Sequence, residues 1–278
     1  MRIIEGQHTK LTRVAHGLTY DPGNDEIIAT EPLAASIVFF HGGASGDHPP
    51  DRVIQGPHTL LHAPWQPAAD DVHNELWIAD LESDALLVFP LNGNGDVAPL
   101  RVIHYGPKSG MRLPSGVAVD PQRNLVAVAA RDRHYNAALF VFRRTDSGDA
   151  TPLSVIEGPA TGIVGLFHVA LYGGQLFAGV DNFYYVPPYD AGGYEPRDGC
   201  QGPTLPWMGP LGFVGVWNVT DNGNVPPHAI IRGAETGMVH PSAVAVDPIH
   251  GEVFATDGVR NGTFGFLVPE FFPSTAPR

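Results

Sequence analysis

The stretch LWIADLESDALLVFPLNGNGDVAPL, from Leu76 to Leu100, decides the fold, together with the RVI at residues 101–103. It reads as a strand that ends in an acid, a turn, a β-rich strand, a Gly/Asn hairpin and a last strand after a proline. Versions of it recur along the chain, each closing on an isoleucine, at Ile4, Ile54, Ile103, Ile156 and Ile231. Steps of about 50 residues, with one longer step, predict blades of four short strands, as in a β-propeller.

Each repeat opens with a short run of small apolar residues that ends in Asp or an equivalent residue. The runs are GLTYDP (17–22), PAADD (67–71), GVAVDP (116–121), HVALY (168–172) and AVAVDP (243–248). Such runs suit a strand buried on both faces, as the innermost strand of a blade is. The sequence therefore predicts an all-β chain that forms a single five-bladed β-propeller with four antiparallel strands per blade.

The repeats also predict the blade boundaries and how the ring closes. We expect blades at about 16–57, 62–107, 112–159, 166–234 and 240–270. The fifth repeat lacks a fourth strand, but RIIEG at Arg2–Gly6, followed by QHT, matches RVIQGPHT at Arg52–Thr59. We expect residues 1–6 to complete the last blade by pairing near Thr263–Val268, so that no sheet edge stays open.

The amino-acid composition excludes several classes of partner and of binding site. The chain of 278 residues has a net charge of −13 and only two lysines, which argues against binding to nucleic acid or to an anionic membrane. Cys200 is the only cysteine, so an internal disulfide and a cysteine-based zinc site are excluded. No 18-residue apolar run and no apolar leader pattern occur. We expect a monomeric, cytoplasmic protein whose partner is a small-molecule substrate.

The pattern V-F, G-x-V-A-P-L-R-x-I-x-G-P, P-S-G-V-A-V-D-P and V-A resembles the bacterial NHL-type β-propeller repeat proteins. These belong to the broad group related to virginiamycin B lyase-like propellers. The resemblance covers essentially the whole chain and implies a propeller fold. The group contains lyases, lactonase-like enzymes and interaction scaffolds, so the resemblance leaves the activity open. Most relatives are expected to have six or seven blades, whereas this sequence predicts five.

Four histidines lie at or shortly before the start of an innermost strand, where loops from all blades meet at one end of the central channel. They are His16, His62, His168 and His240; the third blade offers Arg112 and Ser115 instead. Neutral imidazole is a ligand for Zn, Fe and Cu, so the four predict a divalent metal on the axis. The alternative is that they line a narrow channel without a metal. Five further histidines fall on the opposite, hairpin face and are expected to be solvated: His41, His48, His73, His228 and His250.

Acidic residues end the second strands on the same face as the four histidines. They are Glu31, Asp80, Asp181 and Asp257. An acid at such a position usually caps the turn by accepting backbone N–H hydrogen bonds. The alternative is that one of them reaches the channel as a base or holds a metal ligand in place.

One long insert, Asp181–Gly212, interrupts the fourth repeat between its second and third strands. Long loops in compact domains are usually functional, and the aromatic residues of this one, such as Tyr184, Tyr185 and Trp207, predict a lid over the channel mouth. The alternative is a loop that binds a partner. The shorter loop at residues 131–135 could bring Arg131 and His134 to a substrate carboxylate.

These features give two hypotheses for the function. The first is a metal-dependent enzyme of lyase or oxygenase type, with the four histidines as ligands and Asp181, Tyr184, Tyr185, Arg131 and His134 as catalytic residues. The second is a non-catalytic scaffold that binds a protein or glycan through the same face. Motifs for a serine hydrolase, a phosphate-binding loop or an HExxH metalloprotease are absent from the sequence.

Overall fold

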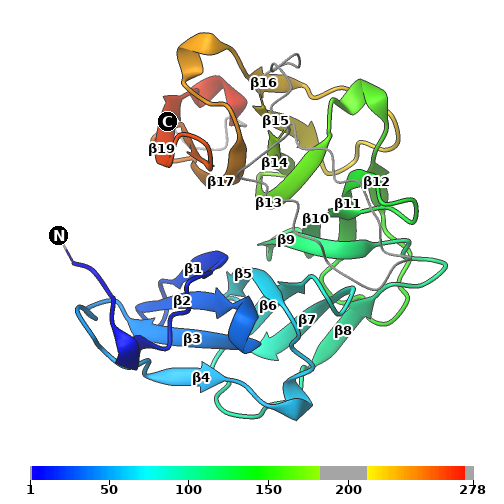
Figure 1. Ribbon diagram of the computed structural model, residues 1–278. Coiled ribbons are helices and arrows are strands. Elements are labelled where there is room, and N and C mark those ends of the chain that lie inside the picture. Colours follow the sequence, from blue (N-terminus) through cyan, green and yellow to red (C-terminus); the bar gives the residue numbers. More distant parts are fainter. Residues whose placement is uncertain (1, 182–211, 273–278) are drawn as a thin grey trace, which may run out of the picture.

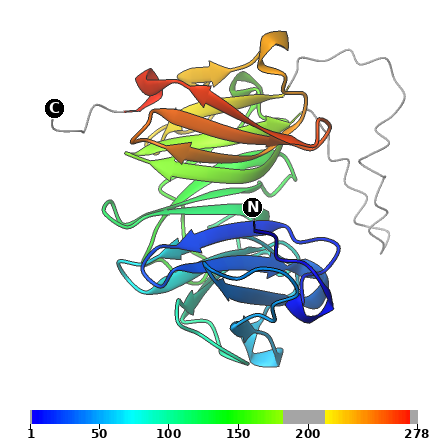
Figure 2. The same ribbon diagram turned by 90° about the vertical axis from the view of Figure 1, so that its left-hand side faces the viewer.

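The structure of the protein is a computed structural model, which describes residues 2–181 and 212–272. It is all-β, with five antiparallel sheets set around a central axis as the blades of a propeller (Figures 1 and 2). The predicted fold class, an all-β five-bladed propeller, is confirmed.

The first four blades each have four strands, which follow chain order from the axis outward. Blade one consists of β1 (Gly17–Asp21), β2 (Glu26–Glu31), β3 (Ser36–His41) and β4 (Arg52–Ile54). Blade two consists of β5 (Pro64–Asp70), β6 (Glu75–Asp80), β7 (Ala85–Pro90) and β8 (Arg101–His104). Blade three consists of β9 (Arg112–Asp120), β10 (Leu125–Arg131), β11 (Ala137–Arg143) and β12 (Ser154–Ile156). Blade four consists of β13 (Gly165–Tyr172), β14 (Gln175–Asp181), β15 (Phe213–Asn218) and β16 (Ala229–Ile231).

The sheet of blade five has three strands within the described residues: β17 (Pro241–Asp247), β18 (Glu252–Asp257) and β19 (Gly262–Leu267). The segment expected to supply the fourth strand lies on blade one, where Ile4 forms a parallel bridge with Gly46. The same bridge joins the fourth strand of each preceding blade to the hairpin of the next: Ile54 to Gly95, Ile103 to Gly148 and Ile156 to Gly223. The N-terminal segment is therefore the repeat equivalent of a fourth strand, as its sequence predicted.

The pairing expected between Arg2–Gly6 and Thr263–Val268 is not formed within the described residues. The reason is that blades one and five are not in contact in that part of the chain in the way that the other neighbouring blades are. The innermost strands contact one another in the order β1, β5, β9, β13, β17, but β17 and β1 have no comparable contact in the described chain (Figure 1). The hydrogen bonds from Glu5 N–H to Gly46 O (3.0 Å) and from Gly46 N–H to Ile3 O (2.6 Å) hold the N-terminal strand on blade one.

A short 3₁₀ turn carries the chain from the outer edge of one blade to the axis of the next. Four such turns are equivalent in the repeat: η1 (Gln7–Thr9), η3 (Pro57–Thr59), η4 (Pro159–Thr161) and η6 (Ala234–Thr236). In η3 the Thr59 hydroxyl donates to Gly56 O (2.7 Å) and accepts from Leu61 N–H (3.3 Å). Gly56 is required here, because its φ is 140° and a Cβ would lie 2.4 Å from Asp96 Cγ. Two other 3₁₀ turns are η2 (Pro32–Ala34) and η7 (Pro269–Phe271).

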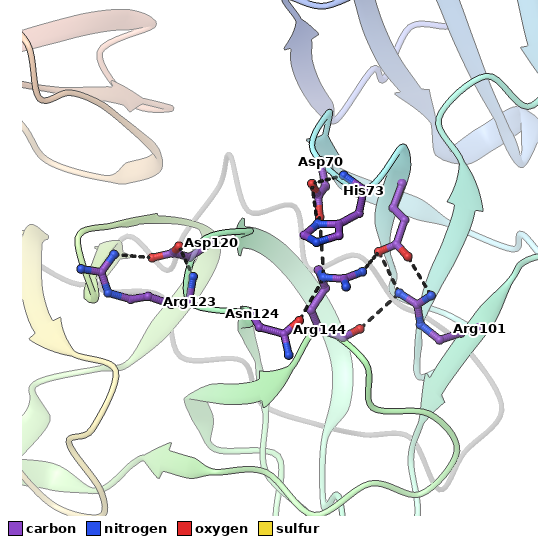
Figure 3. A network of polar contacts seen from close by, with 8 residues as sticks. Asp70, His73, Arg101, Asp120, Arg123, Asn124 and Arg144 are labelled. Carbon is purple, nitrogen blue, oxygen red and sulfur yellow. Dashed lines mark hydrogen bonds and ion pairs between the residues drawn. The ribbon is translucent and has the colours of Figure 1, made fainter.

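Arginines at the start of fourth strands connect neighbouring blades on the hairpin face (Figure 3). Arg101 of β8 forms two hydrogen bonds of 2.8 Å with Glu75 of β6 and one with the carbonyl of Arg144, which belongs to blade three. Arg144 itself donates to Glu75 (2.8 Å) and to Asn124 (3.1 Å). Burial alone raises the pKa of Glu75, but the two guanidinium groups outweigh it and hold that pKa below its ordinary value. The network therefore joins blades two and three through a charged glutamate.

The core consists of apolar layers between facing sheets. Trp77 of blade two packs with Phe140 and Phe142 of blade three, and Trp217 of blade four packs with residues of blades three and four. The outer face of blade one is covered by the N-terminal segment, since Ile4 packs against a cluster that includes Phe40. The described part of the chain contains no helix long and apolar enough to cross a membrane.

The side chain of Gln66 connects three of the innermost strands. Gln66 of β5 donates through Nε2 to Val169 O (3.1 Å), and its Oε1 accepts from the N–H groups of Val117 (3.0 Å) and Val169 (3.2 Å). One side chain thus joins the innermost strands of blades two, three and four. Gly116 allows this approach, because a Cβ there would lie 2.6 Å from Phe167 O.

Candidate site at the channel mouth

Aromatic rings and two of the predicted histidines form a continuous series at the entry end of the innermost strands. His16 stacks on Trp65, with ring centroids 4.0 Å apart, and Trp65 stacks on Phe167 at 5.7 Å. Phe167 meets His240 edge to face at 6.0 Å. These four residues come from blades one, two, four and five, so they lie together at the end of the axis where the sequence predicts the channel mouth. We call this series the ring ladder.

Shifts in the pairing register of the innermost strands determine where these side chains point. The register of β5 with β6 shifts between Pro64 and Pro67, around Trp65 and Gln66. That of β13 with β14 shifts between Leu166 and Val169, around Phe167 and His168. A bulge leaves residues outside the regular pairing and re-aims their side chains, and bulges are common beside functional sites.

The described surroundings keep the imidazoles at this mouth neutral. Burial lowers the pKa of His168 from its ordinary value to about 4, and a positive charge on nearby His16 would lower it further. Burial also lowers the pKa of His16. It lowers the pKa of His240 as well, against the opposing effect of Asp257. At neutral pH all three rings are therefore available as hydrogen-bond acceptors, bases or metal ligands.

Among the residues predicted to be catalytic, Asp181 is the acidic residue that the structure brings to this group. It ends β14 and its side chain is buried, with Oδ2 3.9 Å from Nε2 of His240. Asp181 and His240 thus form a carboxylate–imidazole pair at the edge of the ring ladder. A carboxylate beside an imidazole stabilises the imidazolium that forms when the ring accepts a proton.

His62 lies apart from the other three histidines in its contacts. It is exposed, its Nδ1 faces Leu60 O at 3.1 Å, and its backbone N–H donates to Asp80 (2.9 Å). His62 therefore contributes to blade two through its backbone hydrogen bond to Asp80 rather than through its ring.

Two groups of three metal-ligating side chains converge within the described residues, their ligand atoms lying within 4.8 Å of one another. They are His41, His48 and Asp51, and Asp247, His250 and Glu252. Both lie on the hairpin face. The four channel-mouth histidines do not form such a group in this part of the chain, so a metal shared by His16, His62, His168 and His240 stays a prediction.

The acids that end the second strands act mainly as caps. Asp80 accepts the N–H groups of His62 and Ala63, at 2.9 and 3.1 Å. Asp257 accepts those of Val239 and His240, both at 2.6 Å, and those of Val259 and Arg260. Glu31 binds the N–H of Thr12 (2.8 Å). In blades one, two and five, these carboxylates fasten the connection that enters the blade to the second strand of that blade.

His134 and Arg131, both predicted as catalytic, lie on blade three. His134 lines a separate polar cavity of about 340 Å³ at the outer part of the blade, together with Lys108, Arg133 and Glu157. Burial and the nearby Asp132 raise the pKa of Glu157. None of the ring-ladder residues lines this cavity. Arg131 Nη1 donates to Tyr135 O (3.1 Å), which stabilises the short loop itself.

The remaining predicted residues, Tyr184 and Tyr185, lie outside the described residues, as does Trp207 of the expected lid. The sequence reasoning missed Trp65, Phe167 and Gln66. Each is the second or third residue of an innermost strand, at the level of the histidines. A search of that level for aromatic and amide side chains, as well as for histidines, would have found all three.

The sequence matches no protein-family model. No curated protein matches it either. Among solved structures, the chain is similar to hydrazine synthase of Kuenenia stuttgartiensis, with a TM-score of 0.57 and 15% identity over 91% of this chain and 58% of that one. It is also similar to a chain of a nidogen/laminin complex, with a TM-score of 0.55 and 14% identity over 93% of this chain and 82% of that one.

At these identities the likeness establishes the fold and nothing finer. The chain spans less than two thirds of the hydrazine synthase chain that it matches. The propeller fold implied by the NHL-type resemblance is confirmed, whereas membership of that group has no support from these comparisons. By its described structure and its structural neighbours, this chain is a five-bladed β-propeller.

Proposed function

We propose that the protein is an enzyme of lyase type that binds a small molecule at the channel mouth, where His240 and Asp181 act as its acid–base pair. The observation that carries this proposal is the gathering of three neutral, half-buried imidazoles beside a buried carboxylate and two aromatic rings. Side chains with perturbed pKa values cluster at functional sites, and histidine is the most frequent general acid or base there.

His240, Asp181 and His168 have separate roles in an elimination reaction. His240 accepts a proton from a carbon next to a carbonyl group, and Asp181 stabilises the imidazolium that results. The electron pair of the broken C–H bond forms a double bond as the leaving group departs from the neighbouring carbon with its own pair. His168 is neutral down to about pH 4, so it serves as a hydrogen-bonding group for the bound molecule and not as a second base.

The ring ladder supports a binding role as well. Trp65 and Phe167 place apolar surface beside the imidazoles, and ligand sites typically combine such surface with a few polar groups. The resemblance to virginiamycin B lyase-like propellers leaves the reaction class open, so the proposal rests on the residues themselves. The oxygenase form of the hypothesis needs a metal, and the described histidines supply no converging set of three for it at this mouth.

The structural neighbours are compatible with an enzyme and with an interaction module. One is named as a synthase, and the other was solved in a complex between two proteins. The scaffold hypothesis therefore remains the alternative outcome of the test.

The test is proton exchange and elimination in a panel of small carboxylated molecules with a leaving group β to the carboxylate. In D₂O the protein should incorporate deuterium at the acidic carbon and form a conjugated product with ultraviolet absorbance. His240→Gln should lower the rate by about 10²-fold or more, as loss of a general base does, and His62→Gln should leave it unchanged. Absence of exchange across the panel, together with capture of a partner through the same face, would make the scaffold the better account.

A further inference from the structure

We propose that blade one carries a binding site for a divalent transition-metal ion, formed by His41, His48 and Asp51 on the face opposite the channel mouth. The three side chains offer ligand atoms within 4.8 Å of one another. They come from a single hairpin: His41 ends β3, and the other two lie on the connection to β4.

The local structure holds two of the three ligands in place. The backbone N–H of His41 donates to Asp51 Oδ2 (2.8 Å), which fixes the carboxylate over the end of β3. Nδ1 of the same histidine lies 2.9 Å from that oxygen. The rings of His41 and His48 meet edge to face with centroids 4.8 Å apart.

The ligand set matches the chemistry of zinc and its neighbours. Zn²⁺ binds imidazole nitrogen and carboxylate oxygen at about 2.0–2.2 Å in tetrahedral geometry, with water able to fill a fourth position. Side chains of His41 and Asp51 are 50% and 39% exposed, so small rotations can bring the ligand atoms to tetrahedral spacing without disturbing the core. The exposed position also gives an ion direct access from solvent.

The repeat shows that the fold itself does not require these residues. Counting from the bridging glycine, the positions of His41, His48 and Asp51 are filled by Pro90, Val97 and Leu100 in blade two. In blade three they are filled by Arg143, Ala150 and Leu153. In blade four they are filled by Asn218, Val225 and His228, and His228 is paired there with Asp221. The hairpins of blades two, three and four therefore form the same bridge with at most one metal-ligating residue at these three positions. Three ligating residues at equivalent positions in one blade alone therefore point to a specialised site.

The second converging group, Asp247, His250 and Glu252, has a simpler explanation. Asp247 caps the turn by accepting the N–H groups of Ile249 and His250, and its carboxylate lies 2.6 Å from the His250 ring. Asp70 and His73 repeat the same arrangement in blade two. This group recurs as a turn cap and contains one imidazole, so it serves as the matched control.

A metal at blade one would stiffen the hairpin that receives the N-terminal strand. Gly46, which bridges to Ile4, lies between His41 and His48 in the chain. An ion bound to both histidines would close the loop around that glycine. Because the ion binds only the folded hairpin, it should also raise the melting temperature of the whole protein.

The experiment is calorimetric titration of the full chain, purified without a polyhistidine tag and treated with a chelator, with ZnCl₂ as the probe. We expect one tight site, which weakens at least about 10-fold in His41→Ala and in His48→Ala. Asp51→Asn retains the oxygen that accepts the His41 N–H and should weaken binding without unfolding. Far-ultraviolet circular dichroism checks that each variant is folded.

Two control variants locate the ion. His250→Ala should retain the tight site, and so should the double variant His168→Ala/His240→Ala at the channel mouth. Unchanged zinc affinity in both His41→Ala and His48→Ala would overturn the proposal. Loss of binding only in the channel-mouth variant would also overturn it, and would favour the axial metal instead. Neither result depends on the elimination assay, so the two proposals stand or fall separately.

Discussion

His168 illustrates how one residue of this protein is governed by where the fold places it. Its ring lies at the channel mouth, where burial and the nearby His16 keep it neutral. An unfolded chain has a histidine pKa of about 6.5, so the unfolded state binds a proton more readily than the folded state between that value and about 4. The depressed pKa is therefore a pH-dependent contribution to stability.

The prediction at this scale concerns the pH dependence of unfolding. The contribution of His168 is fully present above pH 6.5 and is lost as the pH falls through about 4. The free energy of unfolding of the parent should therefore decrease between these values by on the order of 3 kcal/mol more than that of His168→Gln. Urea titrations at several pH values measure both curves. Parallel curves for the two proteins would contradict a half-buried, neutral His168.

At the scale of elements, the blades depend on contacts made by their outer strands. Arg101 begins β8 and binds Glu75 of its own blade and a carbonyl of blade three (Figure 3). In blade one, Arg52 repeats the arrangement, binding Glu26 at 3.0 Å through Nε and Leu91 O of blade two at 3.1 Å. The repeated short fourth strand is thus a connector between blades as well as a sheet edge.

The prediction for this element is the cost of neutralising Glu75. Glu75→Gln removes the negative charge between Arg101 and Arg144, which are both largely buried. Because hydrogen bonds to charged groups contribute about 1.5–3 kcal/mol each, we expect a loss of about 2–4 kcal/mol in the free energy of unfolding. Asp47→Asn is the control: it weakens the exposed pair with His8 and should cost much less stability than Glu75→Gln, because solvent screens exposed ion pairs. Equal losses in chemical denaturation would show that the network contributes no more than a surface pair.

At the scale of the whole molecule, the first and last blades of the described ring differ at their outer strands. Blade one carries the N-terminal strand on its outer side, whereas the last strand of blade five, β19, exposes Leu267 to solvent. The N-terminal segment therefore shields one end of the ring in the described structure. Without it, the cluster around Phe40 and Val38 would lose part of its cover.

Deletion of residues 2–9 tests this role. The deletion removes the Ile4 contacts and the hydrogen bonds to Gly46, so we expect a loss of about 2–4 kcal/mol of stability and increased aggregation. Ile4→Ala should reproduce part of the loss. Thermal unfolding and light scattering follow both effects. A shortened protein that melts like the parent would show that blade one needs no N-terminal strand.

The sequence by itself determined the repeat, and with it the blades, their strands and the equivalence of the N-terminal segment to a fourth strand. It could do so because alternation of apolar residues, turn glycines and capping acids act locally, over one strand and one turn. The interpretation of Asp80 and Asp257 as turn caps was also available from the sequence and is confirmed by their backbone hydrogen bonds.

Only the tertiary structure decided which side chains meet at the channel mouth. Register shifts near the start of β5 and β13 turn Trp65 and Phe167 into the space between His16 and His240, while the ring of His62 is exposed. The side of the ring on which Ile4 pairs depends likewise on the spacing between blades. Such choices depend on contacts between residues far apart in the chain, and a repeat pattern, which records only local burial and turns, does not encode them.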